Sequence, residues 1–115
     1  MKKNFIIFLS LFFITLNSLA FAHSPTDIIF NYDAKTKILS VGVAHTVEDA
    51  QKHFIKEITI KVNGKEWIEQ RFTSQVNINV QAASYAQVDL KKGDVIEVLA
   101  VCNKSGQLKN KFQIK

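Results

Sequence analysis

Cysteine is nearly absent from this sequence of 115 residues, which contains only Cys102. A single cysteine cannot form an internal disulfide, and it cannot supply the paired Cys-x-x-Cys spacing of a thiolate zinc site. Proline also occurs once, as Pro25, ahead of the first strand-like run. The composition therefore excludes a disulfide scaffold within the chain, and no proline interrupts the strand patterns described below.

Charge of one sign is nowhere concentrated in this chain. The 15 basic and 10 acidic residues give a net charge of +5, but they are interspersed without a block of like charge. Binding to nucleic acid usually requires a basic patch or stripe, so this composition gives it little support. The weak positive field could still attract a small anion. Ser74, Ser84 and Ser105 lack the sequence context of a nucleophilic serine, so a serine hydrolase is not indicated either.

The first 22 residues have the pattern of a secretory signal peptide. A basic pair at the start is followed by an almost entirely apolar run over residues 5–16. Ala20 and Ala22 provide the small residues of an A-x-A cleavage site. The apolar run is shorter than the roughly 20 residues that a membrane-spanning helix needs. We therefore predict that residues 1–22 are a signal peptide and that the protein is exported to a bacterial periplasm, with no membrane segment after cleavage.

Cleavage after Ala22 would leave residues 23–115, a length that fits one domain. It would remove Lys2 and Lys3, so that 13 basic and 10 acidic residues remain and the net charge is +3. An unpaired thiol in an oxidising compartment is a liability unless it is buried or bound to a metal. Export therefore favours a metal-ligand role for Cys102, although a free cysteine is usually a small buried hydrophobe.

Alternation of apolar and polar residues predicts short strands and no convincing helix. The clearest signal is Asn63–Gly64, because Asn-Gly between two strand patterns favours a two-residue hairpin turn. In the run before this turn, we expect Phe54, Ile58 and Ile60 on one face and Ile55 on the other. Residues 44–53 are predicted as a loop with room for one helical turn. The predicted strands are 28–32, 38–43, 54–62, 65–72, 76–80, 85–90, 95–102 and 108–114.

About eight short strands with turn signals between them predict an all-β fold. We expect an immunoglobulin-like β-sandwich of about seven to eight antiparallel strands. The Cys…Trp…Cys pattern of antibody domains is absent. Loops of a sandwich gather at its two ends, so side chains from different loops can meet there.

Three histidines and the single cysteine form the candidate site. His45 and His53 bracket the loop between two predicted strands, and Cys102 ends another strand. His23 would be the first mature residue. Imidazole and thiolate are metal ligands, and they can share one ion if their strands end at the same pole. We therefore predict a metal site, with the ligands His23, His45, His53 and Cys102.

Simpler roles compete with this hypothesis. A lone surface histidine is usually solvated, which is the simpler interpretation of His23, and for His45 and His53 the two roles are evenly balanced. The spacing His…His…Cys is also permissive. Two histidines that flank one loop, with a cysteine at another strand end, nevertheless favour a metal. Glu48 and Asp49 could be carboxylate ligands, but solvation of the loop is the simpler role.

The sequence resembles the iron domain of the desulfoferrodoxin and superoxide reductase family in two stretches, VGVAHTVEDAQKHFIKEITIKVNGKE and GDVIEVLAVCNKSG, and over nearly the whole predicted mature chain. The resemblance implies an immunoglobulin-like β-sandwich, in agreement with the strand pattern. It implies that His45 and His53 bind a mononuclear, non-haem iron from the loop. Cys102 would supply the axial thiolate, and His23 would match the early histidine of the family.

The sequence departs from the family pattern in several places. Ser105 stands where the family has its last histidine ligand. The histidine loop is longer than usual, and the acid-and-lysine segment ahead of the early histidine would lie in the removed peptide. One cysteine cannot build the four-thiolate site of the additional rubredoxin-like domain. Because of these departures, the resemblance predicts the fold more strongly than it predicts enzymatic activity.

The resemblance implies a superoxide reductase-like oxidoreductase that reduces superoxide, a small anionic oxygen species, to peroxide with an external electron donor. An alternative comes from the predicted terminus, because the α-amine and imidazole of His23 can chelate one metal together. The protein would then be a periplasmic module that binds copper, zinc or iron without turnover. A third hypothesis is a metal-free interaction domain whose histidines are incidental.

Overall fold

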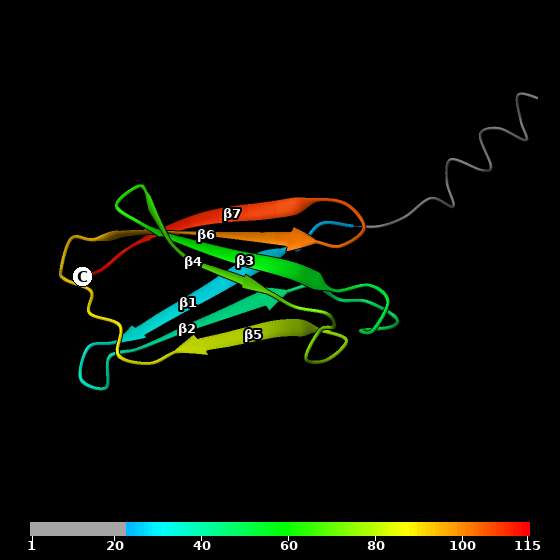
Figure 1. Ribbon diagram of the computed structural model, residues 1–115, viewed down its shortest axis with the longest axis horizontal. Coiled ribbons are helices and arrows are strands. Elements are labelled where there is room, and N and C mark those ends of the chain that lie inside the picture. The colour runs from blue at the N-terminus through cyan, green and yellow to red at the C-terminus, as the bar shows by residue number, and fades with distance from the viewer. Residues whose placement is uncertain (1–22) are drawn as a thin grey trace, which may run out of the picture.

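Figure 1 shows two antiparallel β-sheets packed face to face, in a computed structural model that describes residues 23–115. The predicted signal peptide, residues 1–22, lies outside the described residues. Within the described part no helix could cross a membrane. The strands there are β1 (Asp27–Asp33), β2 (Ile38–Ala44), β3 (Ile55–Val62), β4 (Lys65–Arg71), β5 (Val80–Tyr85), β6 (Val95–Cys102) and β7 (Gln107–Gln113).

One sheet has the strand order β1-β2-β5 and the other the order β4-β3-β6-β7, with antiparallel pairing throughout. This confirms the predicted all-β sandwich of about seven to eight antiparallel strands. The predicted hairpin at Asn63–Gly64 joins β3 to β4, and both turn residues have positive φ, 51° and 83°. Asn and Gly tolerate that conformation better than other residues, which explains why the local signal was reliable.

The core lies between the sheets and follows the alternation of the strands. On β6, which matches the predicted strand 95–102, every second residue from Ile96 to Cys102 is buried. Burying one such aliphatic side chain contributes about 1.5–3 kcal/mol, so this row anchors the fold. The buried cluster consists of Ile28, Leu39, Val41, Val43, Ile55, Ile58, Ile60, Val88, Ile96, Val98 and Ala100.

Side chains also bridge the two sheets along their open sides. Phe30 of β1 stacks on Phe112 of β7, with ring centroids 4.7 Å apart. On the other side, the hydroxyl of Tyr85 on β5 donates to Oε1 of Gln70 on β4 at 2.6 Å. These contacts join the edge strands of the two sheets. The loops lie at the two ends of the sandwich.

A β-bulge corrects one prediction about the face of β3. The register against β6 shifts between Ile55 and Glu57, so the extra residue, Lys56, restores the inward direction of Ile55. Ile55 is therefore fully buried on the same side as Ile58, rather than on the opposite face as we expected. Bulges have this effect because one strand contributes two residues opposite a single partner residue.

The predicted strands over 76–80 and 85–90 are also wrong over most of their length. β5 begins only at Val80, because Oδ1 of Asn77 accepts hydrogen bonds from the amides of Asn79 and Val80 and closes a turn. Val76 and Ile78 are 62% and 50% exposed, so their alternation does not reflect burial. Beyond Tyr85, the chain leaves the sheet.

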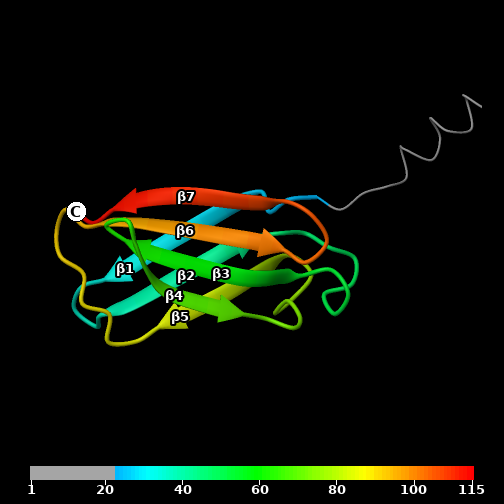
Figure 2. The same ribbon diagram turned by 45° about the horizontal axis from the view of Figure 1, so that its top comes forward.

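The strand directions bring several loops to one end of the sandwich. β2, β4 and β6 end there, and β1, β3, β5 and β7 begin there. Figures 1 and 2 show from two directions that the loops after β2, β4 and β6 gather at this end, close to the start of the described chain. We call it the histidine end, and the opposite end the hairpin end, after the Asn63–Gly64 turn.

Candidate metal centre

His45 reaches the site because it continues the alternation of β2 beyond its last residue. Leu39, Val41 and Val43 face the core, and His45 is the next residue in the same phase. Its amide donates to the carbonyl of Asn79 at 3.0 Å, which extends the strand by one further backbone bond. The imidazole is consequently buried completely, with a relative exposure of 0%.

His53 is positioned by the turn that ends the same loop. Its amide donates to the carbonyl of Asp49 at 2.9 Å, which closes the single helical turn expected in residues 44–53. A carboxylate oxygen of Asp49 also accepts from the amide of Gln51 at 2.9 Å. The turn brings His53 back toward the body of the sandwich, where its side chain is half-buried.

Cys102 is the last inward residue of β6 and is 3% exposed. The next residue, Asn103, ties this strand to the histidine loop. The side-chain carbonyl of Asn103 accepts from the backbone amide of Phe54 at 2.9 Å, and the backbone amide of Asn103 donates to the backbone carbonyl of Phe54 at 2.9 Å. Cys102 and His53 are therefore held side by side, although 49 positions separate them in the chain.

The structure brings three of the four predicted ligands into one cluster. One potential ligand atom from each of His45, His53 and Cys102 lies within 4.8 Å of the others, and such a group could hold a metal ion. Nε2 of His53 is 3.2 Å from Sγ of Cys102. The ring centroids of the two histidines are 4.8 Å apart. The side chains thus meet at one end of the fold, as the metal hypothesis requires.

His23 lies beside this cluster, but its imidazole is not part of that group of three. Its ring centroid is 5.2 Å from that of His45 and 5.4 Å from that of His53. Its backbone carbonyl is 3.2 Å from Nε2 of His45. Ser24 lies so close to Gly106 that a Cβ there would come within 2.9 Å of the Ser24 Cα. Gly106 therefore leaves the space that lets the His23 segment lie against the site.

Gln75 is a member of the site that our sequence reasoning missed. It belongs to the segment after β4 and is 5% exposed, with Oε1 2.9 Å from Nδ1 of His45. Residues 73–75 lie between the predicted strands 65–72 and 76–80, where the sequence predicts no element. A glutamine in a polar segment carries no local signal of burial, and its partner lies 30 positions away.

His53 lies in an environment that favours its metal-binding protonation state. The backbone amide of Lys104, a residue close to His53, also donates to Sγ of Cys102 at 3.4 Å. The pKa of His53 is lowered by burial, and positive charge at His45, His23 and Lys104 lowers it further. A lowered pKa keeps the imidazole neutral, and the neutral ring is the form that binds a metal.

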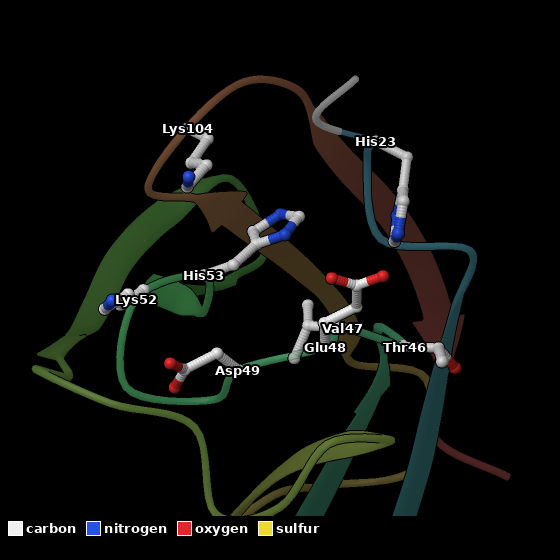
Figure 3. Close-up of a pocket in the computed structure, with 8 residues that line it drawn as sticks. All are labelled: His23, Thr46, Val47, Glu48, Asp49, Lys52, His53 and Lys104. Carbon is white, nitrogen blue, oxygen red and sulfur yellow. The ribbon is translucent and has the colours of Figure 1, made fainter. Parts of the chain in front are cut away.

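A cavity of about 610 Å³ opens beside His53 and His23. Figure 3 shows both rings at this cavity, with Lys104 near His53 and with Glu48 extending from the loop below. The complete lining is His23, Thr46, Val47, Glu48, Asp49, Lys52, His53 and Lys104. A small ligand could reach the cluster from this side, where two lysines and two carboxylates set the local charge.

Ser105, at the position where the resemblance would expect a last histidine ligand, is exposed in the turn between β6 and β7. The carboxylates of Glu48 and Asp49 line the cavity but do not belong to the three-residue cluster. The residues with the strongest claim on a metal are therefore two imidazoles and one thiol. No family model matches this sequence, and no curated protein matches it either, so the resemblance to the desulfoferrodoxin family stays a prediction.

Proposed function

We propose that this protein is an exported, mononuclear metal-binding protein. The ion is held by His45, His53 and Cys102, and His23 acts as a further ligand from the start of the mature chain. The observation that carries this proposal is the convergence of two imidazoles and one thiol, from two distant segments, within 4.8 Å. Export is supported by the signal-peptide pattern, and a ligand role would protect the single thiol from oxidation.

Iron is the metal that we favour, because the ligand types and the family resemblance agree on it. Thiolate and imidazole also suit zinc and copper, so the ligand set alone narrows the metal without selecting it. Bound iron would supply one electron to superoxide, which with two protons becomes hydrogen peroxide, and an external donor would restore the electron. The Cys102 thiolate would favour this transfer by donating electron density to the metal.

The chain's own residues support access of a small anion. Lys52 and Lys104 line the cavity next to His53, and positive charge in a concave site raises the local concentration of anions. Glu48 and Asp49 reduce that field from the same cavity. The net attraction is therefore modest, in keeping with a small, singly charged substrate.

The test is elemental analysis of the exported protein, purified without chelators and compared with Cys102→Ser. We expect about one iron per wild-type chain, a thiolate-to-iron charge-transfer band, and loss of both in the variant. Val98→Thr is a matched control, because it places a hydroxyl on the same buried face of β6 away from the cluster. The proposal would be overturned if the wild-type protein contained no metal, or if Cys102→Ser contained as much metal per chain as the wild type.

A copper- or zinc-binding module without turnover is the second candidate. It is favoured by the position of His23, whose ring lies against both loop histidines. After cleavage at Ala22, the α-amine and the imidazole of His23 could bind one ion together. Three results would select this candidate over the first. The purified protein would contain copper, the His23→Ala variant would lose it, and the reduced protein would not consume superoxide.

A further inference from the structure

The side chain of Gln75 makes four hydrogen bonds inside the histidine end. Its Oε1 lies 2.9 Å from Nδ1 of His45 and accepts from the amide of Ile55 at 3.2 Å. Its Nε2 donates to the carbonyls of His45 at 2.7 Å and of Asn77 at 2.9 Å. One buried amide thus joins the end of β2, the start of β3 and the turn before β5.

These partners determine which way the Gln75 amide faces. The amide of Ile55 can only donate, so the atom that it reaches must be the oxygen. The carbonyls of His45 and Asn77 can only accept, so the atom between them must be the nitrogen. A reversed amide would place two donors together and two acceptors together, which is unfavourable in a buried site.

Both ring nitrogens of His45 face oxygen acceptors, and a neutral imidazole has only one proton to donate. Nδ1 lies 2.9 Å from Oε1 of Gln75 in a buried contact, whereas Nε2 lies 3.2 Å from the carbonyl of His23 in a partly buried one. Two acceptors facing each other without a proton cost more in the shorter, buried contact, so the orientation of Gln75 favours the proton on Nδ1. Nε2 then keeps the lone pair that an ion can bind.

We propose that Gln75 is a positioning residue that holds the proton of His45 on Nδ1 and keeps Nε2 turned toward the metal. The inference rests on the proposed metal site for its function, but the tautomer can be measured without a metal. Hydrogen bonds from a ligand histidine to an outer partner commonly fix its orientation and raise its basicity, and their loss typically weakens metal binding about 10- to 100-fold.

The first experiment is nitrogen-15 NMR of the histidine rings in the wild-type protein, before and after addition of Zn²⁺. We expect His45 to be protonated at Nδ1 in the metal-free protein and to keep that proton when zinc is added. The Nε2 resonance should move to the metal-bound range. A metal-free protein with the His45 proton on Nε2 would overturn the inference without any variant being made.

Three variants separate positioning from simple destabilisation. Gln75→Leu removes all four bonds. Gln75→Glu keeps the acceptor oxygen for Nδ1 of His45 and the amide of Ile55, and loses the donor to the carbonyls of His45 and Asn77 unless its second oxygen carries a proton. Gln81→Leu is the matched control. Gln81 is also buried, at 4% exposure, and within residues 23–115 its side chain bonds to the amide of Val76 and the carbonyl of Ala82, away from His45.

We expect Gln75→Leu to lose the single Nδ1-protonated form and to bind Zn²⁺ about 10- to 100-fold more weakly than wild type. Gln75→Glu and Gln81→Leu should both keep the wild-type tautomer. Retention of that tautomer in Gln75→Leu, or its loss in Gln75→Glu, would contradict the inference. If wild type shows the expected tautomer but takes up no metal, the proposed function fails while the role of Gln75 on His45 stands.

Discussion

The histidine end and the hairpin end of the sandwich both contain well-bonded polar side chains, but the bonds differ in kind. At the hairpin end, Oδ1 of Asn63 accepts from the amide of Val95 at 2.9 Å, and its amide group donates to Asp94 at 3.0 Å. Asp94 also accepts from the amide of Lys91 at 2.8 Å, and these bonds lower its pKa. The side chains there close turns that the backbone alone would leave unpaired.

At the histidine end, the functional side chains contact mainly one another. His53 meets Cys102, and His45 meets Gln75 and the His23 carbonyl. Such contacts can exchange a shared proton for a metal ion, because imidazole nitrogen and sulfur keep lone pairs available. Hydrogen-bonded polar side chains alone therefore do not indicate a metal site. Side chains that can exchange a shared proton for a metal ion do indicate one.

The largest effect is expected from His45→Ala. It removes a completely buried ring and leaves Oε1 of Gln75 without one of its partners. We expect a loss of about 2–4 kcal/mol in the free energy of unfolding, from the cavity and the lost hydrogen bond. Metal binding should fall by more than the ~100-fold that an outer partner can cost. Urea unfolding and zinc titration measure both, and unchanged metal affinity would remove His45 from the site.

Gly106→Ala against Gly93→Ala compares the two ends directly. Both glycines have positive φ, 85° and 93°, so alanine is strained at each and should cost about 1 kcal/mol. A Cβ at Gly93 would meet nothing within 4 Å, whereas at Gly106 it would overlap Ser24. We expect Gly106→Ala to be the less stable variant and the only one that moves His23.

The stabilities of Gly106→Ala and Gly93→Ala can be compared by thermal unfolding. The position of His23 in each variant can be followed by NMR contacts between the rings of His23 and His45. Equal stability losses, with the ring contacts preserved in both variants, would show that the overlap with Ser24 is relieved without moving His23.

A smaller effect is expected from Asn63→Ala at the hairpin end. The substitution removes two side-chain hydrogen bonds and places alanine at a φ of 51°. We expect a loss of about 1–2 kcal/mol in the free energy of unfolding. Zinc affinity should equal that of the wild type, because the turn lies at the far end of the strands. Weaker metal binding here would mean that the two ends are coupled through the sheets.

The smallest effect is expected from Lys104→Ala, which removes one charge near His53. The pKa of His53 lies below its usual 6.5, mainly because of burial, and Lys104 contributes to the shift. Between the folded pKa and 6.5 the unfolded chain binds more protons, so lowering the pH through this window destabilises the metal-free protein. Lys104→Ala should raise the pKa of His53 and so narrow the pH range between that pKa and 6.5.

An NMR titration of the His53 ring protons in metal-free protein measures that change. Lys65→Ala, which removes a lysine at the hairpin end, is the control and should leave the pKa of His53 where it is in the wild type. A pKa that stays constant or falls in Lys104→Ala would contradict the assigned repulsion.

Much of the fold could be predicted because its signals are local. The buried row of β6 and the Asn63–Gly64 turn depend on residues that are neighbours in the chain. The errors have a common cause, since alternation records polarity and not pairing. Val76 and Ile78 alternate like a strand but lie in a turn that Asn77 closes. The side of Ile55 depends on a bulge opposite β6, which its own strand pattern does not reveal.

The candidate site was predictable only as a list of residue types. Histidine and cysteine are rare in this chain, so naming His23, His45, His53 and Cys102 required no structure. The sequence could not show that three of them meet while the ring of His23 lies alongside. Gln75 was missed because glutamine is common in loops and is not a metal ligand.

Side-chain chemistry and near neighbours in the chain were enough to predict most of the strands, the hairpin turn and the side chains able to bind a metal. That His53 meets Cys102 and that Gln75 contacts His45 follows from the tertiary structure instead. Those partners are 49 and 30 positions apart, and they meet because strands that begin and end at one pole are packed in two sheets. Distances between such residues follow from the packing of the whole core, which no local pattern encodes.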